Sequence, residues 1–127
     1  MQEQLKKVAA FNRVFKQTDA NEPTLIPENE FLLRHKLMAE ENDEYKEACW
    51  SGDMVDIADA LGDQLYILCG TMLKHGMQYK MEQVFNEIHE SNMSKLGENG
   101  EPLLREDGKI MKSNLYQKPD ISRILNL

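Results

Sequence analysis

The hydrophobic positions of this chain recur mostly at the three- and four-residue spacing of amphipathic α-helices, and short turn-forming stretches interrupt that pattern. Pro27 suits the first position of a long helix, Asp53 can cap the helix that follows, and Gly76 suits a helix end. The pattern therefore predicts four helices. They are expected over about residues 2–16, 28–50, 54–75 and 79–96.

The chain changes character after Gly97, where helical periodicity gives way to turn sequences. Asn99-Gly100 and Asp107-Gly108 are turn-forming dipeptides, and they predict a small hairpin or an ordered loop. Asp120 can cap a short last helix. We therefore expect an all-α protein with a four-helix antiparallel core and a short irregular or hairpin-like C-terminal tail. The expected arrangement is one domain over residues 1–127, with a helical core over about 2–96 and a tail over 97–127.

The third predicted helix is apolar around most of its circumference, which is typical of a buried helix. A chain of 127 residues offers little interior in which to bury such a helix, and a second subunit is one way to cover it. The sequence therefore favours an oligomer.

The excess of acidic over basic residues excludes some classes of binding partner. With 22 acidic and 15 basic residues, the formal net charge is -7, which argues against binding long nucleic acid or an anionic membrane. A nucleotide is still allowed, because metal ions can bridge carboxylates to phosphates. No stretch approaches the roughly 20 apolar residues of a membrane span, and the N-terminus lacks the apolar run of a signal peptide. We expect a cytoplasmic protein in which Cys49 and Cys69 are buried, reduced thiols.

Acidic residues gather on one face of the second and third predicted helices. Their spacings of one, three and four residues bring them within reach of a common region. No Lys or Arg lies between Asp53 and Leu73 to offset the acids of the third helix. Carboxylate ligands without His or Cys favour magnesium, or manganese, over zinc. The acidic residues are Glu40, Glu41 and Glu44 on the second helix and Asp56, Asp59 and Asp63 on the third.

Two other interpretations of the acidic residues were considered. A solvent-exposed acidic face is the ordinary explanation of such a run, and Lys36 and Lys46 offer partners for the second helix. Apolar residues flank the acids of the third helix throughout, which disfavours this explanation there. A di-iron carboxylate site is disfavoured because none of His35, His75 and His89 has a Glu three positions before it.

The motif Glu40-Glu41-x-x-Glu44, followed by the sequence DALGD that ends at Asp63, resembles the signature of the all-α nucleoside triphosphate pyrophosphohydrolases. That superfamily includes MazG-like proteins, dimeric dUTPases and phosphoribosyl-ATP pyrophosphohydrolases. Its second motif is usually Glu-x-x-Asp, whereas Ala60 stands three positions before Asp63 in this chain. The tail elements SNMSK, EDGK and K-x-x-x-Y are similar to those of the phosphoribosyl-ATP pyrophosphohydrolase-like, MazG-related group.

This resemblance implies a four-helix core of the MazG-like type that assembles as a homodimer or a dimer of dimers. It also implies hydrolysis of a (deoxy)nucleoside triphosphate to the monophosphate and pyrophosphate, with Mg²⁺ held by carboxylates. The implied metal ligands are Glu40, Glu41, Glu44 and Asp63, with Asp59 one helical turn from Asp63.

Glu41 is the candidate general base, because its side chain leaves the helix in a slightly different direction from those of Glu40 and Glu44. Cationic and polar residues elsewhere are candidates for substrate contacts, although each has a surface or packing role as its alternative. These candidates are Arg34, Asn92, Lys95, Lys109, Lys112 and Tyr116.

Three functions stay open at this point. The leading expectation is a house-cleaning nucleotide pyrophosphatase that acts on dUTP or a modified nucleotide. Hydrolysis of phosphoribosyl-ATP is the second, and the long tail disfavours it. A nucleotide-binding module without activity is the third, and the Ala60 departure keeps it open.

Overall fold

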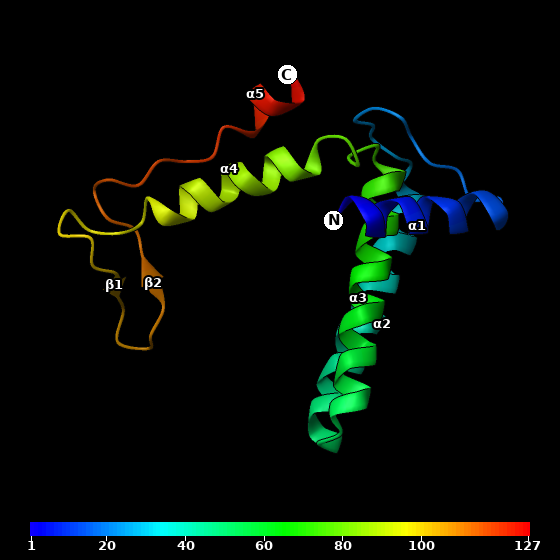
Figure 1. Ribbon diagram of the computed structural model, residues 1–127, viewed down its shortest axis with the longest axis horizontal. Coiled ribbons are helices and arrows are strands. Elements are labelled where there is room, and N and C mark those ends of the chain that lie inside the picture. The colour runs from blue at the N-terminus through cyan, green and yellow to red at the C-terminus, as the bar shows by residue number, and fades with distance from the viewer. The chain divides into compact units, whose positions relative to one another are not determined.

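The computed structural model describes residues 1–127 and divides them into two compact units, each described separately (Figure 1). The first unit, Met1–Tyr79, contains helices α1 (Gln2–Val14), α2 (Glu28–Ser51) and α3 (Met54–Lys74). The second unit, Lys80–Leu127, contains helix α4 (Met81–Met93), strands β1 (Leu103–Leu104) and β2 (Ile110–Met111), and helix α5 (Ile121–Leu125).

Helices α2 and α3 form an antiparallel hairpin that makes up most of the first unit (Figure 1). The turn between them is short because Gly52 adopts a left-handed conformation with φ of 72°. The side chain of Asp53 then accepts a hydrogen bond of 2.8 Å from the backbone N–H of Val55, which caps α3 as the sequence predicts. This tight turn brings the acidic parts of both helices alongside each other.

Helix α1 packs on α3 and covers its C-terminal half. Leu5 and Val8 of α1 are buried with Leu73 of α3, and Phe11 meets Tyr66 edge to face. These contacts leave the N-terminal half of α3, where the acidic residues lie, free of α1.

The loop between α1 and α2 is fixed to the end of α3. Backbone N–H groups of Ala20 and Thr24 donate to the carbonyls of Leu73 and His75, at 3.0 and 2.9 Å. Gly76 allows this approach, since it adopts φ of 67° and a Cβ there would lie 2.0 Å from a backbone oxygen. The sequence assigns Gly76 a helix-ending role, and the structure adds the close packing of this loop.

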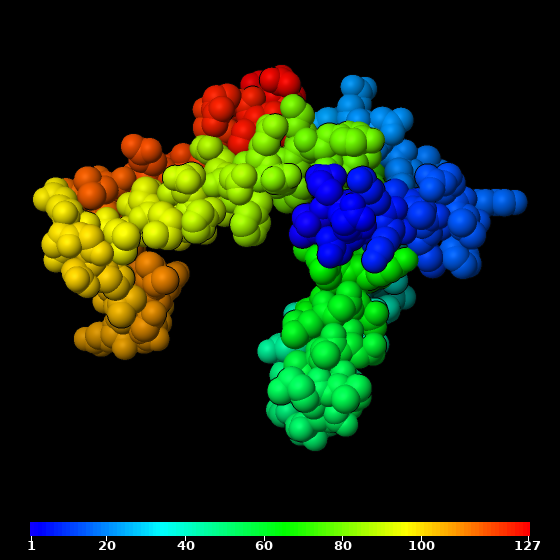
Figure 2. All heavy atoms as spheres, in the orientation of Figure 1, coloured from blue at the N-terminus to red at the C-terminus, as the bar shows by residue number.

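The second unit is a helix followed by a small hairpin and a terminal helical turn. Helix α5 lies against α4, as the red and yellow-green spheres of Figure 2 show. Strands β1 and β2 are antiparallel, so the hairpin predicted from the turn dipeptides is present. The side chain of Asp120 accepts from the backbone N–H of Arg123 at 3.2 Å and caps α5, again as predicted.

The predicted all-α class with a short C-terminal tail is confirmed, whereas two details of the prediction are wrong. Helix α4 ends at Met93 rather than near residue 96, because the Ser94 hydroxyl donates to the carbonyl of Ser91 at 2.6 Å and competes with the helix. Cys49 is exposed, while Cys69 is buried. Within one chain the third helix leaves apolar side chains uncovered, since Leu61 is 50% exposed, and the second subunit expected to cover them stays a prediction. The single-domain organisation stays a prediction.

No helix of the chain combines the length and the apolar character needed to cross a membrane.

Candidate metal and catalytic site

Three carboxylates of the first unit meet between α2 and α3. Glu41 and Glu44 project from α2 and Asp63 projects from α3, and one oxygen of each lies within 4.8 Å of the others. The spacing of three residues puts the two glutamates on neighbouring parts of one helical face, and the antiparallel pairing brings Asp63 opposite them. The sequence-predicted residues Glu41, Glu44 and Asp63 are therefore brought together.

The carboxyl group of Glu41 is the most enclosed of the three. Its Oε2 atom is buried and has no hydrogen-bond partner, whereas Glu44 and Asp63 are exposed. A buried carboxylate oxygen without a donor is unfavourable unless a positive charge or a proton compensates it. An all-oxygen set with one orphaned atom fits a hard divalent cation such as Mg²⁺ or Mn²⁺.

The surroundings of Glu41 also raise its pKa above the ordinary carboxyl value. Burial of the carboxyl group is the largest cause, followed by repulsion from Glu44 and the sharing of a proton with it. The negative charges of Asp63 and Glu40 raise the pKa further. Glu41 thus accepts a proton more readily than an ordinary carboxyl group when no cation is present.

Two further predicted ligands lie at the edge of the cluster rather than inside it. Glu40 is exposed on α2 and acts on the cluster through its charge. Asp59 lines a cavity of about 340 Å³ together with Glu44 and Asp56, towards the turn between α2 and α3. Ala60, which stands where the superfamily motif has Glu, lines the same cavity and is only 4% exposed. Asp56 and Asp59 are therefore the carboxylates of α3 that face this cavity.

Arg34, a predicted substrate contact, lies within the α2–α3 interface. Its Nε donates to Thr71 Oγ1 at 3.0 Å, and its Nη2 donates to the carbonyl of Ile67 at 2.8 Å. Burial lowers the pKa of Arg34, and the nearby charge of Asp19 partly opposes that shift. A Cβ on Gly70 would lie 2.7 Å from Nη2, so this glycine makes room for the guanidinium group. Arg34 thus joins the two helices that carry the acids.

The remaining predicted substrate contacts belong to the second unit. The Nζ atom of Lys112 lies 4.6 Å from the centre of the Tyr116 ring, so these two residues are together. The backbone N–H of Lys109 donates to Asp107 in the turn of the hairpin, at 3.1 Å. Asn92 lies in the last turn of α4, and its carbonyl accepts from the N–H of Lys95 at 3.2 Å.

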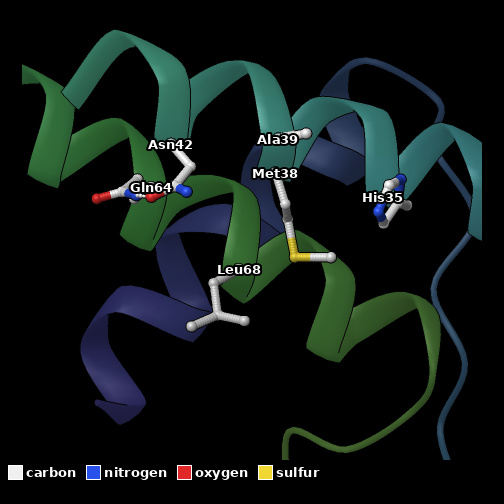
Figure 3. Close-up of a pocket in the computed structure, with 6 residues that line it drawn as sticks. All are labelled: His35, Met38, Ala39, Asn42, Gln64 and Leu68. Carbon is white, nitrogen blue, oxygen red and sulfur yellow. Dashed lines mark hydrogen bonds between the residues drawn. The ribbon is translucent and has the colours of Figure 1, made fainter. Parts of the chain in front are cut away.

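One feature of the α2–α3 pair is absent from the sequence predictions. The Nε2 group of Gln64 donates to Asn42 Oδ1 at 3.0 Å and bridges the helices beside a cavity of about 440 Å³ (Figure 3). Asn42 and Glu44 are two residues apart, so their side chains point about 160° apart around α2. This cavity therefore lies on the opposite side of the helix pair from the acidic cluster. No local signal identifies the bridge, because it depends on the register of two helices.

A mainly helical chain with a carboxylate cluster between two antiparallel helices is typical of the helical pyrophosphohydrolases, and a comparison with known families defines the class. Residues 8–92 match the profile of the phosphoribosyl-ATP pyrophosphohydrolase family, and the chain belongs to that family. The matched range contains all five predicted metal ligands. The resemblance drawn from the sequence motifs is thereby confirmed.

No curated protein matches the chain. Among solved structures, it is similar to a crystal structure from Exiguobacterium sp. 255-15 of a protein provisionally named an NTP pyrophosphohydrolase. The two sequences are 22% identical, the similarity covers 94% of this chain and 90% of that one, and the TM-score is 0.34.

Proposed function

We propose that the chain hydrolyses a (deoxy)nucleoside triphosphate to its monophosphate and pyrophosphate, with Mg²⁺ or Mn²⁺ bound by the acidic cluster. The observation that carries the proposal is the orphaned, buried Oε2 of Glu41 among the carboxylates of Glu44 and Asp63. Membership of a pyrophosphohydrolase family supports the reaction class. The carboxylates of the cluster would repel a triphosphate, and a bound divalent cation would offset that repulsion.

In this proposal the ion is held by Glu41, Glu44 and Asp63, with Glu40 and Asp59 completing the ligand set. When bound, a divalent cation neutralises charge on phosphate oxygens and lowers the pKa of water. The chain supplies the rest of the chemistry. Water attacks one phosphorus atom of the α–β anhydride, the bond from that phosphorus to the bridging oxygen breaks, and either pyrophosphate or the nucleoside monophosphate leaves. Glu41 accepts the proton that the water loses.

The substrate contacts suggested by the sequence are part of the same proposal. Lys95, Lys109 and Lys112 would contact phosphate groups, and Asn92 would bond phosphate or base. Tyr116 would close over the nucleotide, with its ring already held by Lys112. Arg34 keeps the two N–H groups of Nη1 and one N–H of Nη2 for a substrate, since Nε and the other N–H of Nη2 donate to α3.

A second subunit belongs to the same proposal. Leu61, Leu65 and Leu68 form a stripe along α3 at spacings of four and three residues, and they are 50%, 38% and 42% exposed. A helix with such a face in water is expected to be covered. We assign that face to a homodimer or a dimer of dimers.

The test is release of pyrophosphate across the standard ribonucleoside and deoxynucleoside triphosphates with Mg²⁺, and again with EDTA. Glu41→Gln and Asp63→Asn should each abolish release while the fold is kept, since each removes one ligand charge at nearly constant shape. Asp43→Asn is the matched control, because Asp43 is exposed on α2 and lies outside the cluster. Full activity in both cluster variants would refute the proposed site.

A second candidate substrate is phosphoribosyl-ATP, which the description of the matching family favours. It contains the same kind of anhydride and can use the same carboxylates. Phosphoribosyl-ATP therefore belongs in the panel. Release from it alone would assign the chain to that reaction. Absence of release from every compound, in folded protein, would favour a nucleotide-binding module without activity.

A further inference from the structure

A second cavity in the first unit has no part in the acidic cluster. It lies between α1 and the segments that flank the end of α3, and its volume is about 440 Å³. Leu5 and Leu73 form its apolar floor. Along α3, Leu73 lies ten residues beyond Asp63, which is about 15 Å at the helical rise. This volume is in the range of small-molecule sites, which lie between roughly 300 and 1,000 Å³.

The side chain of Gln78 lines this cavity and is incompletely bonded. The residue is 8% exposed, and its Nε2 donates to the carbonyl of Ala20 at 2.8 Å. Its Oε1 atom is buried and has no hydrogen-bond partner. Buried carbonyl oxygens are almost always paired, and an unpaired one is unfavourable. A ligand that completes this site therefore needs an N–H or O–H group to donate to Gln78.

The rim of the cavity is cationic on its α1 side. Lys6 and Arg13 both line it and lie seven residues apart on one face of α1. Arg13 forms no ion pair, and Lys6 pairs only with the exposed Glu3, at 3.5 Å. An unpaired guanidinium group is suited to a phosphate, which it can bind through two parallel hydrogen bonds.

Two further residues of the lining indicate which kind of ligand the cavity can bind. The ring of Tyr79 lines the cavity and is 69% exposed, so a planar group can stack on it. Asp19 is the one acidic residue of the lining, so the cavity lacks the carboxylates that would hold the cation of a magnesium triphosphate. The lining therefore suits a planar donor joined to a single phosphate.

We propose that this cavity binds a nucleoside monophosphate. An N–H of the base donates to Gln78 Oε1, the base stacks on Tyr79, and Arg13 binds the phosphate with Lys6 adding positive charge. The site is distinct from the acidic cluster and needs no metal ion. Its occupancy therefore does not depend on the proposed hydrolysis, although a monophosphate is also the product of that reaction.

The test is isothermal titration calorimetry of the full chain in EDTA with dUMP, dAMP and inorganic phosphate. EDTA removes the cation on which nucleotide binding at the acidic cluster depends, so the two proposals are measured separately. We expect at least one mononucleotide to bind, and inorganic phosphate to bind more weakly because it offers no base. Binding should persist in Asp63→Asn.

Variants at the rim locate the ligand without disturbing the core. Arg13→Gln removes the phosphate contact and should weaken mononucleotide binding by about tenfold or more. Tyr79→Ser should weaken the mononucleotides but leave phosphate unchanged. Lys7→Gln is the matched control, since it makes the same charge change on α1 at an exposed position outside the cavity. Absence of binding to the parent chain, or equal affinities for Arg13→Gln and Lys7→Gln, would overturn the proposal.

Discussion

Replacing Glu41 by Gln should stabilise the metal-free protein even though it removes a proposed ligand. The carboxyl of Glu41 is enclosed, its Oε2 has no donor, and the carboxylates of Glu44 and Asp63 lie within 4.8 Å. Gln has nearly the same shape but no charge. The substitution therefore removes repulsion in the folded state, while the unfolded chain, in which these charges are far apart and hydrated, is little affected.

The size of the effect follows from the number of close contacts. Like charges at such spacings destabilise a helix by a few tenths of a kcal/mol per pair, so the contacts with Glu44 and Asp63 give about 0.5–1 kcal/mol. For a chain of 127 residues this corresponds to a rise in Tm of about 2–5 °C.

The sign of the pH dependence is fixed by the direction of the pKa shift. The pKa of Glu41 is raised in the folded protein, so the parent chain loses stability relative to Glu41→Gln as pH rises through the ordinary value of 4.5 towards the folded value. Below 4.5 the carboxyl group is protonated in both states, and the difference between the two proteins should become small. Near neutral pH the difference should be fully present.

Thermal unfolding followed by circular dichroism, in EDTA and then with Mg²⁺, tests this reasoning. In EDTA near neutral pH, Glu41→Gln should melt at the higher temperature, with Asp43→Asn as the control for general charge reduction. Mg²⁺ should raise the Tm of the parent chain more than that of Glu41→Gln. A lower Tm for Glu41→Gln in EDTA, or equal stabilisation of both proteins by Mg²⁺, would refute the account of the cluster.

Three further perturbations have clear expected outcomes. Gly76→Ala should lower the free energy of unfolding by more than about 1 kcal/mol, since φ is 67° and the new Cβ would meet the backbone of Glu22; unchanged denaturant midpoints would contradict this. Near pH 8, a disulfide reagent should modify the exposed Cys49 quickly and Cys69 slowly, because burial raises the pKa of Cys69; equal rates would be inconsistent with the structure. Leu65→Glu should shift the molar mass from light scattering towards the monomer, and an unchanged mass would remove the α3 stripe from the proposed interface.

The predictions that succeeded rest on local chemistry, and those that failed depend on contacts between distant residues. Asp53 and Asp120 cap helices because their side chains reach nearby N–H groups, which depends on a few consecutive residues. The end of α4 was misplaced because the hydroxyl of Ser94 competes for a helix carbonyl, and apolar periodicity does not report such competition. The exposure of Cys49 depends on which face of α2 meets α3.

In the candidate site, too, some features follow from local helix geometry and others depend on contacts between helices. The spacing of Glu41 and Glu44 places them on one side of α2, so their proximity follows from helix geometry alone. Their meeting with Asp63 follows once α2 and α3 pair antiparallel across a short turn. The hydrogen bond from Gln64 to Asn42 could not be predicted, because it depends on how α2 and α3 are aligned along each other, and a single sequence does not give that alignment. Gly70, a glycine inside a helix, is a signal of close approach that points to Arg34 only after the fold is known.

For Arg34, a role in helix packing and a role in substrate binding predict different experimental results. It lies two helical turns before Glu41 and gives two hydrogen bonds to α3, so it helps to set the register that brings the carboxylates together. Arg34→Met should lower the free energy of unfolding by about 1–3 kcal/mol, because it removes charged donors from partly buried acceptors. If packing is the main role, KM for the best triphosphate should change less than about twofold below the melting transition, while a direct phosphate contact would raise KM by tenfold or more. We expect the first result, because only Nη1 of Arg34 has no partner on α3. Unchanged stability together with a raised KM would instead assign Arg34 to the substrate.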